Sequence, residues 1–259
     1  MEKHHIQNQL KSLKLSAMAQ QLEMRLLEAQ QNGLDYLSFL SMLLTDENEC
    51  REQRKMERLI QQAHFGHQQY LEDFDVSLST GLKPTLLREL ATCRFIDAAQ
   101  GVIINGPPGT GKTHLAKGLG HAACRHLRGV RFFKFNELFN HLEQLGQDQE
   151  HADRKWRKLV ATDLIIIDDF AFRRITQAQS EQLYQLVDSC YGTSSIILTS
   201  NRDLSNWLDV FPDPIIGGAI LDRLAHSAHQ IVLKGESIRK KLRLNNSPKS
   251  QLENKNESP

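Results

Sequence analysis

Apolar residues in the first part of the chain follow the spacing of amphipathic helices. Between residues 6 and 31 they recur at three-, four- and five-residue steps, and Asn32-Gly33 then supplies a helix stop. A second helix is expected to begin near Asp35, with a charged middle at residues 45–58 that faces solvent. We predict a small helical domain at residues 1–72, which serves either to dock a partner or to form oligomers. Its apolar positions are Leu10, Leu13, Met18, Leu22, Leu26, Ala29, Leu37, Leu40, Leu44, Met56, Leu59, Ile60 and Ala63.

Short β-branched runs alternate with helical segments beyond a stretch of acidic, hydroxyl, Gly and Pro residues at 70–84. The runs are apolar on both faces, which is typical of parallel strands covered by helices. They lie at residues 102–104, 130–135, 164–167, 195–198 and 230–233. The sequence therefore predicts an α/β fold, a parallel-sheet sandwich, at residues 73–244. Residues 245–259 contain one Leu and no aromatic residue, so we predict a disordered tail.

The overall composition narrows the class of protein only a little. The 259 residues include 32 Lys and Arg against 31 Asp and Glu, so the net charge of +1 does not by itself indicate a nucleic-acid partner. The four cysteines lie far apart without a CxxC pair, which argues against a zinc site or a disulfide framework. The start of the chain has no apolar signal core, and no run approaches the roughly 18 apolar residues of a membrane span. We expect a soluble, cytoplasmic protein without membrane contact.

Residues 106–113 read Gly-Pro-Pro-Gly-Thr-Gly-Lys-Thr and match the phosphate-binding pattern GxxxxGK[ST]. An apolar strand precedes them and a helical segment follows, as a phosphate-binding loop (P-loop) requires. The loop is expected to bind ATP with backbone N–H groups, Lys112 to bridge the β- and γ-phosphates, and Thr113 to bind Mg²⁺. The alternative is a Gly-rich turn that merely precedes a helix. The predicted nucleotide-binding residues are Gly106, Pro107, Pro108, Gly109, Thr110, Gly111, Lys112, Thr113 and His114.

Two carboxylates end the apolar run at residues 163–170, where the sequence reads DLIIIDDF. If this strand and the strand before the P-loop are parallel neighbours, both groups lie at one edge of the sheet. Asp168 is then expected to hold Mg²⁺ through water, and Asp169 to orient the water that attacks the γ-phosphate. The alternative is a polar strand end that caps the next helix.

Four segments together resemble the motifs of AAA+ ATPases. GPPGTGKT resembles Walker A, LIIIDDF Walker B, SIILTSN at 195–201 the sensor 1 strand, and GAILDRLAH at 218–226 the arginine-finger box. The segments LKLSAMAQQLEMRL, LEDFDVS, LATCRFIDAAQ and GESIRKKL narrow the resemblance to the IstB proteins. These are transposition helper ATPases of bacterial insertion sequences and are related to the helicase loader DnaC. The resemblance covers nearly the whole chain except the tail.

The resemblance implies further site residues. Asn201 would be sensor 1 and help to position the lytic water, and Arg223 would be the finger that reaches the ATP of a neighbouring subunit. A strand-closing turn Asn and a solvated helix Arg are the alternatives. Arg239 would be the second sensor arginine, although the helical lid that usually carries it has little chain left to form. The predicted catalytic residues are Lys112, Asp168, Asp169, Asn201 and Arg223.

Asp169 departs from the pattern, because most AAA+ proteins have Glu at this position. The side chain is one methylene shorter, and a misplacement of about 1 Å can reduce a rate about 100-fold. We therefore expect slow, regulatory hydrolysis, with ATP acting mainly as a switch for assembly.

Basic residues form three groups that are candidates for contact with DNA phosphates. They lie at residues 125–134, at 154–158 around Trp156, and at 234–243. By resemblance to initiator-type AAA+ proteins, the second group is favoured, although a charge run is usually a solvated face. The predicted DNA-binding residues are Arg154, Lys155, Arg157 and Lys158.

The resemblance implies three kinds of partner: double-stranded DNA, the transposase of the same element, and further copies of this chain. The nearest rival is a DnaC-like loader that serves a replicative helicase. Two other classes are a metabolic P-loop kinase and a binding module with an inactive ATPase site. The kinase alternative lacks support, because the sequence between Lys112 and Asp168 shows no acceptor-binding lid and no Arg-rich phosphate clamp.

Overall fold

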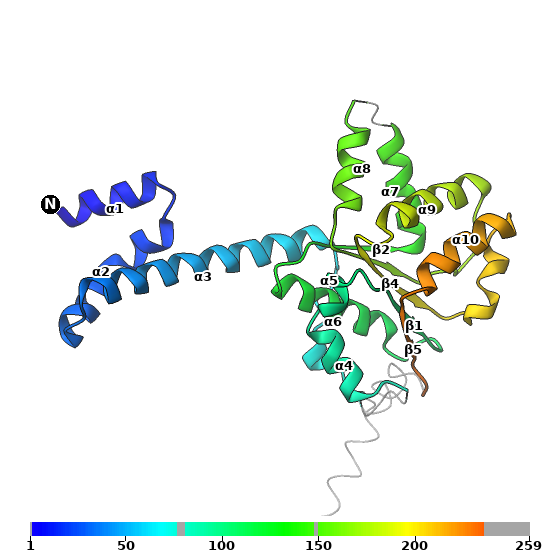
Figure 1. Ribbon diagram of the computed structural model, residues 1–259, viewed down its shortest axis with the longest axis horizontal. Coiled ribbons are helices and arrows are strands. Elements are labelled where there is room, and N and C mark those ends of the chain that lie inside the picture. Colours follow the sequence, from blue (N-terminus) through cyan, green and yellow to red (C-terminus); the bar gives the residue numbers. More distant parts are fainter. Residues whose placement is uncertain (1, 77–80, 148–149, 236–259) are drawn as a thin grey trace, which may run out of the picture. The chain divides into compact units, whose positions relative to one another are not determined.

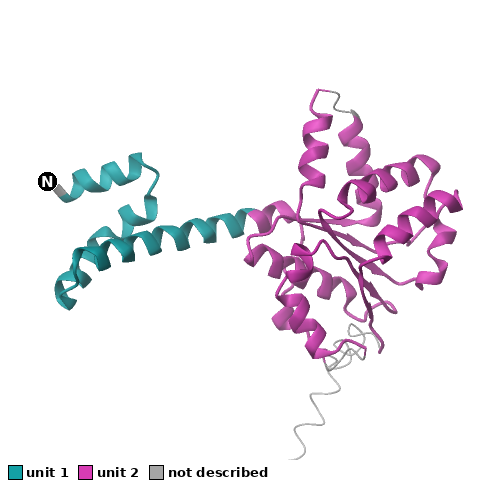
Figure 2. Ribbon diagram, in the orientation of Figure 1, with its two compact units in different colours: residues 1–58 teal, residues 59–259 magenta. Residues whose placement is uncertain are grey.

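The computed structural model describes residues 2–76, 81–147 and 150–235 and divides the chain into two compact units. The units comprise residues 1–58 and 59–259 (Figure 2). The expected boundary near residue 72 therefore lies within the second unit. The reason is that Ala63 and Phe65, which follow the charged stretch, are buried in the core of the second unit.

Three helices form the first unit: α1 (Glu2–Ser12), α2 (Ser16–Asn32) and the beginning of α3 (Tyr36–Ala63). The helix stop at Asn32-Gly33 is confirmed, because Gly33 has φ 61° and its N–H donates to Ala29 O. The single helix expected at 6–31 is wrong, since the chain turns at Lys14, which has φ 60°. A small core of Met18, Leu22 and Leu43 holds the unit together.

Most residues at 45–58, the middle of the second predicted helix, are exposed as expected, and Glu47 is the buried exception. Its side chain is buried, and one carboxylate oxygen accepts the N–H groups of Ala17 and Met18 at 2.8 and 3.2 Å. The other oxygen is 2.8 Å from Arg51 Nε. Glu47 thus satisfies the first backbone donors of α2, which have no partner within their own helix.

A five-stranded parallel sheet forms the centre of the second unit, in the order β2-β3-β4-β1-β5 (Figure 1). In the register, Val102 pairs with Ile197 and His229, and Leu164 pairs with Val130 and Ser195. The five predicted strands are confirmed, and β1, β3 and β4 are buried along their whole length. The strands are β1 (Val102–Asn105), β2 (Val130–Lys134), β3 (Leu164–Asp168), β4 (Ser195–Ser200) and β5 (His229–Val232).

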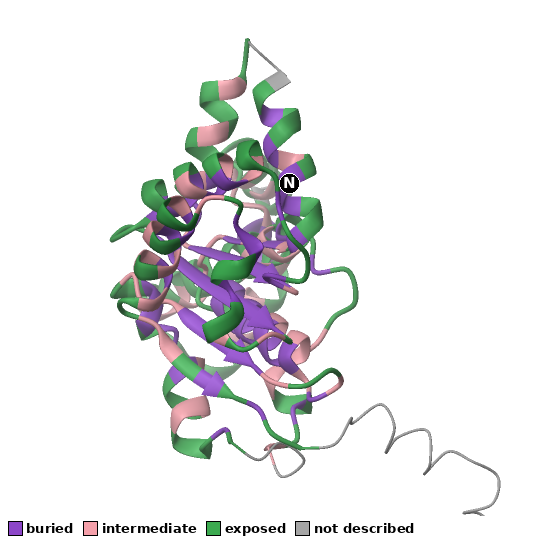
Figure 3. Ribbon diagram, turned by 90° about the vertical axis from the view of Figure 1, so that its right-hand side faces the viewer, coloured by how far each residue is buried: buried purple, intermediate pink, exposed green. Residues whose placement is uncertain are grey.

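Helices cover both faces of this sheet, so that its strands are enclosed (Figure 3). Alternate residues of each strand face the two cores: Ile104 and Ile166 contribute to one, and Ile103 and Ile165 to the other. The first core is covered by α4 (Pro84–Ala91), α5 (Arg94–Asp97), α6 (Lys112–Arg125) and the short turn η1 (Leu71–Asp73). The second is covered by α7 (Phe135–Gln147), α8 (Ala152–Val160), α9 (Gln177–Cys190), η3 (Leu204–Asn206), η4 (Leu208–Val210) and α10 (Pro214–Ala225). The predicted α/β sandwich is confirmed.

The strand order corrects one expectation, because β1 and β3 are not neighbours. Strand β4 lies between them and pairs with both. All strands are parallel, so the P-loop after β1 and the carboxylates at the end of β3 still lie at the same edge. The end of β4, with Ser200 and the following Asn201, separates them. Among the described residues, no helix has both the length and the apolar character needed to cross a membrane.

Candidate nucleotide site

The P-loop leads from β1 directly into α6, and its shape depends on glycine. Gly106, Gly109 and Gly111 have φ angles of 153°, 84° and 92°, which L side chains rarely adopt. A Cβ at residue 106 would lie 2.3 Å from Leu233 O, a backbone atom that cannot easily move. The Gly106 N–H donates to Ser200 O at 3.2 Å. The loop is thus fixed to β4 and exposes the N-terminus of α6, where backbone N–H groups bind anions well.

Lys112 lies in the first turn of α6 with its ammonium group turned back toward the loop. The residue is buried, and Nζ donates to Pro107 O at 2.8 Å and to Asn201 Oδ1 at 2.6 Å. Thr110 Oγ1 also donates to Pro107 O, at 2.9 Å. The structure therefore brings together Lys112 and Asn201, which are far apart in the sequence.

Thr113 and Asp168 form the second part of the site. Thr113 Oγ1 donates to the Asp168 carboxylate, 2.9 Å from Oδ1 and 3.1 Å from Oδ2. The same Oδ1 accepts the hydroxyl of Thr199. Asp168 is buried, and Thr199 is fully buried at 0% exposure. Thr199 was not among the residues predicted from the sequence, whereas Asn201, which follows β4, was. The signal for Thr199 is a hydroxyl residue within the apolar run SIILTS.

Asp169 lies beside these groups in a turn of unusual backbone geometry. Its φ is 56°, and its N–H donates to Thr199 Oγ1 at 3.0 Å. Asn201 Nδ2 donates to Asp169 Oδ1 at 3.4 Å. Burial, and next the neighbouring Asp168 carboxylate, raise the pKa of the Asp169 carboxyl, and Lys112 opposes this rise. Asp169 also lines two cavities, one with Asn201 and the other with Lys134.

The chemistry of these groups suits a magnesium-bound triphosphate. The Thr113 hydroxyl and the Asp168 carboxylate supply oxygen atoms, which Mg²⁺ prefers as ligands. The loop at residues 106–111 curls so tightly that a side chain at position 106 would not fit. Lys112 adds a positive charge within the same cradle. Among the described residues, no group of three or more His, Cys, Asp and Glu side chains suits a metal ion.

His114, which was included among the predicted nucleotide-binding residues, points elsewhere. Its ring Nε2 is 2.9 Å from Tyr70 O, and the ring meets Phe74 edge-on at a centroid distance of 5.7 Å. A contribution of its side chain to nucleotide binding stays a prediction. Arg239 lies outside the described residues.

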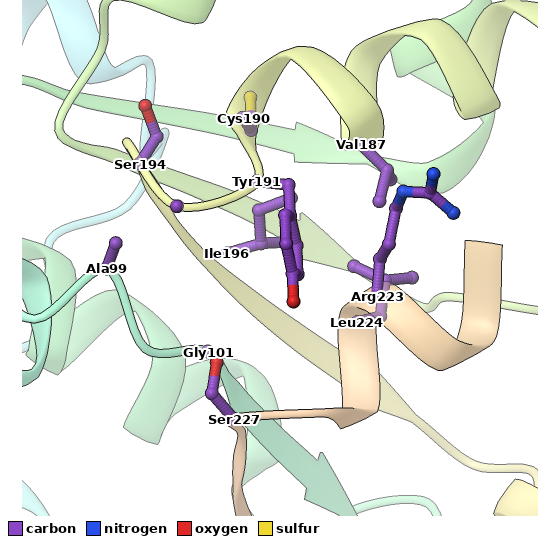
Figure 4. A pocket seen from close by; sticks show the side chains of 11 residues that line it. Ala99, Gly101, Val187, Cys190, Tyr191, Ser194, Ile196, Arg223, Leu224 and Ser227 are labelled. Carbon is purple, nitrogen blue, oxygen red and sulfur yellow. The ribbon is translucent and has the colours of Figure 1, made fainter. Parts of the chain in front are cut away.

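Arg223 lies on α10 away from the P-loop of its own chain. Its Nη2 is 3.0 Å from Asp188 Oδ1 and 3.3 Å from Tyr184 Oη, and its guanidinium lies over the Tyr184 ring. It lines a small cavity with Gly101 and Ser194, the residues just before β1 and β4 (Figure 4). Arg223 is therefore at the edge where the strands begin, whereas the P-loop is at the edge where they end.

The predicted DNA-binding residues lie on α8, which packs beside α7 (Figure 1). All four side chains are exposed, while Trp156 and Leu159 of the same helix face the core. The group at 125–134 is different, because Arg125 pairs with Glu72 at 2.8 Å and Arg128 pairs with Asp97. Most of the third group lies outside the described residues.

The parallel sheet, the P-loop at the end of β1 and the carboxylates at the end of β3 define a P-loop nucleotide-binding protein of the AAA+ type. Solved structures support this fold. The crystal structure of the DnaC helicase loader matches with a TM-score of 0.51 and 20% identity, over 64% of this chain and 96% of that one. The replication initiator DnaA bound to AMPPCP and single-stranded DNA matches with a TM-score of 0.53 and 19% identity, over 73% and 59%.

The profile of the IstB-like ATP binding proteins matches residues 8–246, and the chain belongs to this family. An insertion-sequence ATP-binding protein of Mycobacterium tuberculosis is 38% identical, over 92% of this chain and 95% of that one. The IS21 ATP-binding protein of Pseudomonas aeruginosa is 34% identical, over 92% and 89%. The predicted resemblance is confirmed at the level of the family.

Proposed function

We propose that this protein is an ATP-dependent, DNA-binding AAA+ ATPase that assists the transposition of an insertion sequence. The observation that carries the proposal is the cluster at the carboxyl edge of the sheet, where Lys112 contacts Asn201 and Thr113 contacts Asp168. The family supports ATP as the ligand, and the relatives are named as proteins of insertion sequences.

The geometry suggests a role for each residue of the cluster. The N–H groups of residues 109–113 bind the phosphates, Lys112 exchanges Pro107 O and Asn201 for phosphate oxygens, and Thr113 and Asp168 hold Mg²⁺. The ion, when bound, neutralises negative charge on the phosphates. Asn201 Nδ2 donates to Asp169 Oδ1 at 3.4 Å, so the two side chains lie side by side and together orient the attacking water. The short Asp169 side chain in a fixed turn favours slow hydrolysis.

Arg223 supports an oligomeric ATPase. Its position at the amino edge of the sheet does not suit the phosphate site of its own chain, so we assign it to the ATP of a neighbouring copy. The four exposed cations of α8 are assigned to double-stranded DNA. In this scheme ATP promotes assembly on DNA, and the assembly recruits the transposase.

Sizing the full chain with duplex DNA tests this proposal. We expect a large complex with ATP and Mg²⁺, and small species with ADP or without nucleotide. Lys112→Ala should remain small under all three conditions. A large complex that forms equally with ATP, with ADP and without nucleotide would instead indicate a constitutive DNA-binding protein.

The alternative is a DnaC-like helicase loader, which the fold of the DnaC structure favours. The two functions differ in the partner protein. Co-purification of the full chain with either the transposase of its element or the host replicative helicase separates them. Recovery of the helicase alone would decide for the loader.

A further inference from the structure

Thr199 has no assigned role, yet its side chain joins the two carboxylates of the nucleotide site. It lies near the end of β4, the strand between the P-loop strand and the carboxylate strand. Its neighbours Ile197 and Leu198 are core residues, whereas its hydroxyl is polar and completely buried. Buried polar groups are nearly always hydrogen-bonded, and the partners of this hydroxyl are Asp168 and Asp169.

The directions of these two hydrogen bonds follow from the chemistry of the groups. A hydroxyl has one proton to donate and lone pairs that accept. Because the backbone N–H of Asp169 can only donate, Thr199 Oγ1 accepts there, at 3.0 Å. Its single proton is therefore directed to Asp168 Oδ1. One side chain thus fixes both the carboxylate rotamer of Asp168 and the backbone of the left-handed turn at Asp169.

Asp168 Oδ1 accepts from Thr113 as well, at 2.9 Å, so the carboxylate is held from two sides. Thr113 belongs to the P-loop helix and Thr199 to β4. This arrangement resembles metal sites in which an outer hydrogen bond orients a ligand, and loss of such bonds typically costs about 10- to 100-fold in metal affinity or activity.

We propose that Thr199 is the positioning residue for the magnesium-binding carboxylate, and that its hydroxyl couples Mg²⁺ to nucleotide binding. The proposal rests on the proposed ATP function of the site. Thr199 acts through Asp168, which its hydroxyl holds in the orientation that Mg²⁺ requires.

Equilibrium binding of a fluorescent ATP analogue tests the proposal without a measurement of hydrolysis. The quantity of interest is the factor by which saturating Mg²⁺ tightens binding relative to excess EDTA. Thr199→Val and Thr199→Ala should reduce this factor by about 10-fold, while binding in EDTA stays near that of the parent. Thr199→Ser keeps the hydroxyl and should preserve the factor.

Thr162→Val is the matched control. Thr162 is also buried, and its hydroxyl donates to Lys158 O at 3.2 Å, just before β3 begins and away from the carboxylates. This change should lower the melting temperature without altering the effect of Mg²⁺. The comparison of Ser with Ala at position 199 isolates the hydroxyl even if Val does not fit.

Two outcomes separate this proposal from the function on which it rests. If the parent shows tighter binding with Mg²⁺ and Thr199→Ala keeps the same factor, the role of Thr199 is wrong and the ATP site stands. If the parent does not bind the analogue, or ignores Mg²⁺, the proposed function fails and the role of Thr199 fails with it.

Discussion

The four exposed cations of α8 give a quantitative prediction for DNA binding. Each Lys or Arg that neutralises a phosphate contributes about 0.9 to the slope of log K against log salt concentration on duplex DNA. Changing Arg154, Lys155, Arg157 and Lys158 to Ala should therefore lower the magnitude of that slope by up to about 3.6. Over a fourfold change in salt concentration, this difference corresponds to roughly 100-fold in affinity.

The structure indicates that this variant will fold. Helix α8 is attached to the core through Trp156 and Leu159, which remain in place, and all four changed side chains are exposed. Alanine also has a higher helix propensity than Lys or Arg. The melting temperature and the affinity for the ATP analogue should stay close to those of the parent.

The assay is a salt titration of duplex binding by fluorescence anisotropy, with ATP and Mg²⁺ present. A control variant removes Lys83, Arg88 and Arg94, which are exposed cations on or beside α4 and α5, the helices on the other face of the sheet. The control should leave the slope nearly unchanged. If the slope of the α8 variant equals that of the parent, α8 is not the DNA-binding surface.

Three further predictions concern the nucleotide site and the first unit. Lys112→Ala removes the positive charge that contacts Pro107 O and Asn201, so ATP-analogue binding should weaken at least about 10-fold in titrations, and unchanged binding would overturn the assignment. Asp169→Asn should abolish ATP hydrolysis yet raise the melting temperature at neutral pH. The raised pKa of Asp169 means that the folded state is favoured by protonation, so this stabilisation should shrink as pH falls through the raised value toward the ordinary Asp range, and a constant difference would contradict it. Glu47→Ala leaves the N–H groups of Ala17 and Met18 without their acceptor and should destabilise the first unit by about 1–3 kcal/mol in chemical denaturation, whereas Glu49→Ala, an exposed change on the same helix, should have little effect.

Local sequence patterns predicted the strands and the P-loop because both depend on short-range chemistry. The P-loop needs glycine at fixed positions, and Gly106 has no room for a Cβ. The buried strands needed only runs such as LIIID, which are apolar on both faces. These signals do not require knowledge of which strand lies next to which.

Local hydrophobic and polar patterns could not predict contacts that depend on the strand order or on residues far apart in the sequence. Insertion of β4 between β1 and β3 is a property of the whole sheet, and it places Thr199 against Asp168 across 31 positions of the sequence. Glu47 was assigned to solvent because it lies in a charged run, whereas the donors that its carboxylate accepts from, the N–H groups of Ala17 and Met18, belong to another helix. The break at Lys14 was missed because apolar spacing continues across it.

The parallel strands place the P-loop and Arg223 at opposite edges of the sheet. This separation is the reason why we propose that Arg223 acts on the nucleotide of a second copy of the chain. The P-loop lies where the strands end, and Arg223 lies near the residues that precede β1 and β4, where they begin. Within its own chain, the guanidinium donates to Ala219 O and Tyr184 Oη and forms an ion pair with Asp188 Oδ1, and both contacts with α9 use Nη2. A bidentate contact with a phosphate needs two N–H groups on one edge of the guanidinium, so Tyr184 or Asp188 has to release Nη2.

The Asp188 side chain is 52% exposed, and exposed ion pairs contribute only about 0–1 kcal/mol. In the oligomer that we propose, a phosphate presented by a neighbouring copy would therefore compete readily with Asp188 for Arg223. Because ADP offers no γ-phosphate for this exchange, the loss of the intrachain pair would accompany assembly with ATP alone. In this proposal, a contact between opposite edges of two sheets would make association depend on the nucleotide.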